Sequence, residues 1–129
     1  MIIIKTTESA EMYLETIMML QKQRANVRAI DIVHQTGYSK PSISRAMSLL
    51  KKSEHIEIDE LGYITLTSKG IEVASKIVER HEILSKVLIS LGVDPEIAAV
   101  DACRIEHVIS DETFERIKQH IQQMSGGQQ

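Results

Sequence analysis

Apolar positions in the first part of the chain recur among polar ones with the spacing of an amphipathic helix. Positions three and four apart share one face of a helix, and apolar side chains recur in this way at Met12, Leu14, Ile17, Met18 and Leu20. The pattern predicts a helix over residues 7–23. The segment AIDIVHQTG predicts a second, shorter helix that stops at Gly37, because glycine favours the left-handed conformation that ends helices.

The next segment, YSKPSISRAMSLLKKSE, predicts a third helix with a polar outer surface. Ser39 is placed to cap this helix, and Pro41 fits the first turn, where a missing N–H costs nothing. Its apolar positions predict a buried stripe made of Ile43, Met47 and Leu50. The remaining positions are small, polar or basic: Ser42, Ser44, Arg45, Ser48 and Lys52.

The period changes from helical to strand-like after residue 54. In HIEIDELGYITLT apolar and polar residues alternate on both sides of a Leu61-Gly62 turn, which predicts a β-hairpin. A long helix is predicted over residues 68–91, and Gly92 and Pro95 then interrupt it. Pro95 begins a further helix to about residue 109, and Ser110-Asp111 cap a last one that ends near residue 124.

This order of elements predicts a fold that is mainly α with a small β-hairpin. Three helices followed by a two-stranded hairpin are typical of a winged helix-turn-helix, and in helix-turn-helix proteins a recognition helix enters the major groove of DNA. We therefore predict two domains. Residues 1–70 form a winged helix-turn-helix DNA-binding domain, and residues 71–129 form a second, helical domain.

The charge distribution agrees with a DNA-binding first half, although the net charge of the chain is −3. Residues 20–53 contain seven Lys or Arg and one acid, whereas residues 82–129 contain four bases and eight acids. A local basic segment indicates contact with a polyanion. The residues expected to contact double-stranded DNA are Arg28, Ser39, Lys40, Pro41, Ser42, Ser44 and Arg45.

The composition limits the other classes of protein. A single cysteine excludes an internal disulfide, and the opening MIIIK is too short for the apolar part of a signal peptide or a membrane span. We therefore expect a cytoplasmic protein with no membrane partner. No phosphate-binding loop and no dinucleotide fingerprint occur in the sequence, so an organic cofactor is not expected.

The stretch DACRIEHV, residues 101–108, contains that cysteine. On a helix, Cys103, Glu106 and His107 project from one face and offer a thiolate, a carboxylate and an imidazole to a divalent cation. Three donors that approach from one side cannot complete a coordination shell, so other segments must contribute. Candidates are Met12 and Glu15, three apart on the first helix, and His81 on the long helix.

Each of these residues also has an ordinary structural or catalytic interpretation. Met12 could fill the core, and Cys103 could be a small apolar residue of an amphipathic turn. His81 could be a surface residue, and Glu15 could simply be solvated. Cys103 with His107 could form a nucleophile and its base, but no glycine-rich oxyanion loop accompanies them. His81-Glu82 begins like the zinc-protease motif HExxH, but Ser85 stands where the second histidine is needed. We therefore do not expect an enzyme.

The motifs EMYLETI, SKPSIS and DACRIEHVISDE resemble those of the diphtheria-toxin-repressor family. This family consists of metal-dependent transcriptional repressors with an iron-sensing and a manganese-sensing branch. The resemblance extends from about residue 7 to residue 124 and is to the two-domain form. It implies that the domain 71–129 contains the helical linker between the two domains and binds metal. It also implies that this domain forms a homodimer through the helices after Pro95.

The resemblance also implies roles for the donor residues. Met12, Cys103, Glu106 and His107 match the principal metal site of the iron branch. His81 matches an ancillary ligand of that branch and a ligand of the manganese branch.

Other positions differ from the iron branch. Glu15 matches a ligand of the manganese branch alone, and Ser85 and Ala99 replace ancillary ligands of the iron branch. Because thioether and thiolate donors lower the preference for Mn²⁺, the expected cofactor is Fe²⁺, with Mn²⁺ as the alternative. Co²⁺, Ni²⁺ or Zn²⁺ could bind in vitro.

The expected function is therefore repression that depends on metal. The dimer binds operator DNA when Fe²⁺ or Mn²⁺ joins the first helix to the dimerisation domain, and it controls genes of metal homeostasis. The alternative is a metal-independent winged-helix regulator that senses an organic ligand, or a redox signal through Cys103.

Overall fold

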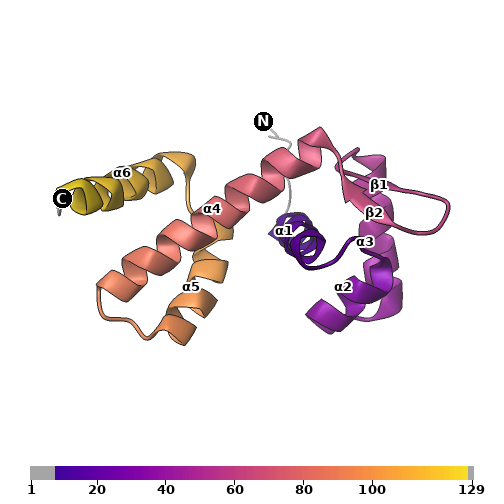
Figure 1. Cartoon of the computed structure of the whole chain (residues 1–129), viewed down its shortest axis with the longest axis horizontal. Coiled ribbons are helices and arrows are strands. Elements are labelled where there is room, and N and C mark those ends of the chain that lie inside the picture. The colour runs from indigo at the N-terminus through magenta and orange to yellow at the C-terminus, as the bar shows by residue number, and fades with distance from the viewer. Residues whose placement is uncertain (1–7, 128–129) are drawn as a thin grey trace. The chain divides into compact units, whose positions relative to one another are not determined.

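A computed structural model describes residues 8–127, and within this range the chain forms six helices and one hairpin (Figure 1). The predicted class, mainly α with a small β-hairpin, is confirmed. The chain divides into two compact units, the first ending at Ser75 and the second beginning at Lys76. The elements are α1 (Glu8–Gln23), α2 (Ala29–Thr36), α3 (Lys40–Lys52), β1 (Ile56–Ile58), β2 (Ile64–Leu66), α4 (Ser68–Ser90), α5 (Pro95–Val108) and α6 (Asp111–Gly127).

The core of the first unit is built from the apolar stripes of its helices and hairpin. Burial of aliphatic side chains is the main source of folding free energy. The side chains with almost no exposed surface are Leu14, Ile17, Val27, Ile32, Ile43, Ile56 and Ile64. The predicted stripe of the third helix is confirmed, since Ile43, Met47 and Leu50 are all buried.

The ends of α2 and α3 follow the local signals in the sequence. Gly37 closes α2 with φ of 80°, and its N–H donates to the carbonyl of Val33. Ser39 precedes α3, and its hydroxyl accepts a hydrogen bond of 3.3 Å from the N–H of Ser42. Pro41 lies in the first turn of α3, as predicted.

The hairpin is antiparallel, with Ile56 opposite Leu66 and Ile58 opposite Ile64. Its turn is held by Asp59, whose Oδ1 accepts from the N–H groups of Leu61 and Tyr63, both at 2.9 Å. The outer side of β2 is also bonded, because the N–H of Ile64 donates to the carbonyl of Val27 at 2.7 Å.

The second unit consists of the rest of α4 together with α5 and α6. Asp94 caps α5 by accepting from the N–H groups of Glu96 and Ile97, and Pro95 opens its first turn. Ser110 caps α6 by accepting from the N–H of Thr113 at 3.1 Å. α6 extends to Gly127, three residues beyond the predicted end, so the boundary predicted near residue 124 is wrong.

None of the helices in the described range is long and apolar enough to cross a membrane. The assignment of residues 1–70 to DNA binding and of residues 71–129 to metal binding and dimerisation stays a prediction.

Candidate metal centre

One face of α5 is almost completely removed from solvent. Ala98, Ala102 and Glu106, at intervals of four, each have 0% exposed surface. Two small residues and one carboxylate therefore share this buried face. A buried carboxylate is costly unless it is paired, hydrogen-bonded or bound to a metal, so Glu106 indicates a specific polar environment.

The expected donors of α5 come together around Glu106. The ligand atoms of Cys103, Glu106 and His107 all lie within 4.8 Å of one another. Nε2 of His107 is 3.4 Å from Oε1 of Glu106, and the side chain of His107 is only 3% exposed. Cys103 is the most exposed residue of the three.

A fourth donor reaches the same carboxylate from α4. Nδ1 of His81 lies 3.0 Å from Oε2 of Glu106, and the His81 side chain is 33% exposed. The Glu106 carboxylate is therefore flanked by two imidazoles from different helices. Two imidazoles, a carboxylate and a thiol are a donor set that suits a borderline divalent cation such as Fe²⁺, Co²⁺ or Zn²⁺.

The two remaining expected donors lie in the first unit. Met12 is partly buried and packs against the core of that unit, and Glu15 is buried at 9% exposure. Both lie on α1, three positions apart. Their part in metal binding stays a prediction. Among the positions that differ from the iron branch, the hydroxyl of Ser85 is buried without a hydrogen-bond partner in the described part of the chain.

All of the expected DNA contacts except Arg28 lie at the start of α3. Lys40, Pro41, Ser44 and Arg45 are exposed, and Ser42 is half-buried. Ser39 is also exposed, but its hydroxyl lies 2.9 Å from that of Ser42. Arg28 lies apart from this group, directly before α2, with its guanidinium 4.7 Å from the centre of the Tyr63 ring.

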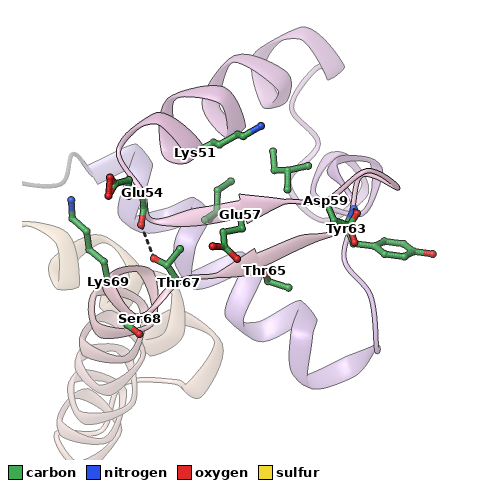
Figure 2. Close-up of a pocket in the computed structure, with 11 residues that line it drawn as sticks. Lys51, Glu54, Glu57, Asp59, Tyr63, Thr65, Thr67, Ser68 and Lys69 are labelled. Carbon is green, nitrogen blue, oxygen red and sulfur yellow. Dashed lines mark hydrogen bonds between the residues drawn. The ribbon is translucent and has the colours of Figure 1, made fainter.

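A groove of about 790 Å³ lies between the end of α3, the hairpin and the start of α4. Figure 2 shows its lining, in which Thr67 bonds to the main chain of Glu54 at 2.6 Å. Lys69 donates to the carbonyl of Ser53 at 3.0 Å. These side chains join α4 to the segment before β1, and none of the expected metal donors lines the groove.

One residue at the centre was missed by the sequence analysis. Arg80 is buried, with 6% of its surface exposed, and it donates to the main chain of Glu106 at 3.1 Å. Its neighbour His81 was singled out, but Arg80 itself belongs to no motif. Its partners lie more than 25 positions later, so no local spacing reveals the contact.

Comparisons with known proteins place this site in a family. A family model described as "Iron dependent repressor, metal binding and dimerisation domain" matches residues 67–125. The HTH-type transcriptional regulator MntR of Bacillus velezensis is 33% identical over 117 residues, which cover 91% of this chain and 82% of that protein. The chain belongs to the diphtheria-toxin-repressor family of metal-dependent transcriptional regulators.

Solved structures agree with this membership. A manganese-dependent transcriptional repressor in complex with manganese matches with a TM-score of 0.79 and 26% identity, over 86% of this chain and 51% of that one. IdeR of T. acidophilum matches with a TM-score of 0.75 and 25% identity, over 92% and 55%. The chain thus spans about half the length of these solved chains. Members of the family are transcriptional regulators and not enzymes, so the expected class is confirmed.

Proposed function

We propose that this chain is a metal-dependent transcriptional repressor that binds operator DNA as a homodimer and controls genes of metal homeostasis. The observation that supports it most directly is the group of donors on α5. Cys103, Glu106 and His107 place their ligand atoms within 4.8 Å of one another, and His81 lies beside the same carboxylate. Met12 and Glu15 complete the proposed ligand set.

The proposed DNA-binding domain is a winged helix-turn-helix formed by residues 1–70. α3 is its proposed recognition helix, because hydroxyl and basic side chains are exposed in its first half. The hairpin carries three acids, Glu57, Asp59 and Glu60, and no base between its ends. Contacts to phosphates are therefore expected from α3 and Arg28 more than from the hairpin.

The proposed homodimer forms through the helices of the second unit. Ile97, Val100 and Val108 on α5 are 55%, 55% and 73% exposed. Several exposed aliphatic side chains on one helix indicate a surface that another protein covers. A symmetric dimer presents two recognition helices, so the operator is expected to be a pseudo-palindrome.

We propose Fe²⁺ as the physiological metal and Mn²⁺ as the alternative. The argument is the chemistry of the donors, since Cys103 and Met12 offer sulfur, which Mn²⁺ accepts less readily. A related solved repressor is described as manganese-dependent, so both metals belong in the test. A bound cation would supply one centre to which donors from both units are attached.

In this proposal the cation acts as a co-repressor. Met12 and Glu15 would hold the same ion as Glu106 and His107, and the two DNA-binding domains of a dimer would then keep the separation of successive major grooves. Without metal they sample other separations, and the fraction able to bind both half-sites falls.

The test is DNA binding with and without metal. Duplexes are first selected from a random pool on the protein loaded anaerobically with Fe²⁺ or with Mn²⁺. Fluorescence anisotropy on the selected duplex then compares each metal with a chelated buffer. We expect tight binding only with metal, and weak binding with either metal for Cys103→Ser combined with His107→Ala. His120→Ala, which changes an exposed histidine of α6, is the matched control.

Equal affinity with and without chelator would contradict the proposal and favour the metal-independent regulator. Loss of binding on oxidation of Cys103 would then indicate a redox sensor. The DNA surface is tested separately with Arg45→Ala. A base contact lowers the preference for the selected duplex, whereas a phosphate contact lowers affinity for all duplexes and reduces the salt dependence.

A further inference from the structure

Arg80 is a buried cation next to the candidate metal centre. A buried guanidinium needs hydrogen-bond acceptors and a counter-charge around it to offset the cost of removing it from water. Its Nη1 donates to two main-chain carbonyls, those of Glu106 at 3.1 Å and Ile109 at 2.8 Å. Both acceptors lie at the C-terminal end of α5, in or just after its last turn.

The other side of the guanidinium faces α6. Nη2 of Arg80 pairs with the carboxylate of Asp111, the first residue of α6. The guanidinium also lies 5.3 Å from the centre of the Phe114 ring, a cation–π contact. Lys76 pairs with Asp111 as well, at 2.8 Å, and its hydrogen bond is the main reason why the pKa of Asp111 lies below the ordinary value, with Arg80 contributing.

The hydrogen bonds of Arg80 reach the part of α5 that carries proposed metal ligands. The last carbonyls of a helix have no partner within the helix, so the final turn is the part that frays most easily. In α5 this turn contains Glu106 and His107. Arg80 bonds the main chain of Glu106, and His81 contacts its carboxylate at 3.0 Å. Two consecutive residues of α4 therefore contact the same glutamate, one at its main-chain carbonyl and the other at its side-chain carboxylate.

We propose that Arg80 is a positioning residue of the metal centre, which fixes the last turn of α5 so that Glu106 and His107 share one ion with Cys103. The inference rests on the proposed metal-binding function of these donors. Groups that orient metal ligands without touching the ion typically change metal affinity by roughly 10- to 100-fold when they are removed.

The test uses the full chain, with Co²⁺ as the probe. Coordination by the Cys103 thiolate gives a charge-transfer band, which reports both affinity and geometry. Arg80→Met keeps the apolar stem and removes all five donors, and we expect a dissociation constant larger by roughly 10- to 100-fold and a shifted band. Arg80→Lys restores the charge but has a single nitrogen, so its dissociation constant should lie between those of the parent and of Arg80→Met.

The matched control is Lys118→Met. Lys118 pairs with Glu79 at 2.7 Å, so this change also removes a cation that joins α4 to α6, but one that pairs with Glu79 and not with a proposed metal ligand. It should leave the affinity and the band unchanged. Circular dichroism at the temperature of the titration shows that each variant is folded, which separates loss of positioning from loss of the fold.

A parent-like affinity and band in folded Arg80→Met would overturn the inference. If Arg80→Met does not fold, Arg80→Lys decides in the same way, because one ammonium nitrogen cannot reproduce the forked contacts. Cys103→Ser and His107→Ala are titrated beside them. If these two also bind Co²⁺ like the parent, the proposed metal centre is wrong; if only they lose affinity, the role of Arg80 alone is wrong.

Discussion

Gly70, in the first turn of α4, is a residue whose size decides how closely that helix approaches the hairpin. A Cβ at this position would overlap the carbonyl oxygen of His55 and crowd the side chain of Leu66. Gly70→Ala therefore forces the main chain apart, and overpacking of this kind costs about 1–3 kcal/mol. Urea unfolding should show this loss in the free energy of unfolding.

Gly37→Ala is the matched control, since it adds the same methyl group in open space. Its cost comes from the backbone alone, because Gly37 has φ of 80°, and a left-handed residue with a Cβ costs about 1–2 kcal/mol. Gly37→Asn should recover part of that loss, since asparagine tolerates this conformation. Gly70→Asn should recover none, and recovery there would refute the close-approach argument.

His55 gives the first unit a dependence on pH. Its Nδ1 lies 2.7 Å from the hydroxyl of Ser53, and burial, with the charge of Lys69 as a second cause, lowers its pKa below the ordinary 6.5. The unfolded chain therefore takes up this proton at a higher pH than the folded chain. The contribution of His55 to the free energy of unfolding is fully present above about pH 6.5. It is lost as the pH falls below that value towards the lower pKa of the folded chain.

The measurement is the free energy of unfolding in urea between about pH 8 and about pH 5, in a chelated buffer. We expect His55→Gln to flatten the decrease below pH 6.5. His34→Gln, which changes an exposed histidine of α2, should leave the decrease in place. An unchanged slope in His55→Gln would show that other groups cause the dependence.

At the scale of the element, the start of α3 combines a structural and a proposed functional role. The hydroxyl of Ser39 accepts from the N–H of Ser42, and removing such a cap costs about 1 kcal/mol. Ser39→Ala should therefore lower both stability and DNA affinity. Ser39→Asp keeps a capping oxygen, so stability should be retained, whereas its negative charge opposes the phosphates and DNA affinity should fall.

The two measurements are thermal unfolding and anisotropy with the selected duplex. Ser48→Asp adds the same charge on the exposed side of α3, nine positions further along, and it measures the general electrostatic cost. If Ser39→Asp and Ser48→Asp weaken binding equally, Ser39 has no specific position at the DNA.

The elements themselves were largely predictable because their signals are local. The cap of α3, the left-handed Gly37 and the alternation around the Leu61-Gly62 turn each depend on a few consecutive residues. Arg80 and Gly70 were not predictable, because their partners lie far along the chain. Arg80 bonds residues 26 and 29 positions later, and Gly70 is required by the carbonyl of His55, 15 positions earlier.

The same distinction holds for the candidate site at the scale of the whole molecule. Cys103, Glu106 and His107 could be grouped from sequence, because donors three and four apart on one helix must lie side by side. The contact of His81 with Glu106 joins two helices; His81 could be named as a candidate donor from sequence, but its pairing with Glu106 could not be derived from spacing. The periodicity of a sequence does not indicate which faces of two helices pack together, so the contacts between α4 and α5 could not be predicted from it.

Coupling between metal and DNA is the property that tests the whole molecule. If metal raises DNA affinity about a hundredfold, the coupling free energy is about 2.7 kcal/mol. Linkage then requires DNA to raise metal affinity by the same factor. Co²⁺ titrations with and without the selected duplex, together with anisotropy with and without Co²⁺, measure both factors, and they should agree.

Met12→Ala combined with Glu15→Gln removes the proposed ligands of the first unit and leaves those of α4 and α5. This variant should still bind Co²⁺ through the second unit, with lower affinity, but its coupling factor should fall towards one. Met19→Ala, an exposed methionine on the same helix, should keep the full factor. A parent-like coupling factor in the double variant would mean that the metal signal reaches the proposed DNA-binding domain without Met12 and Glu15, through α4 itself.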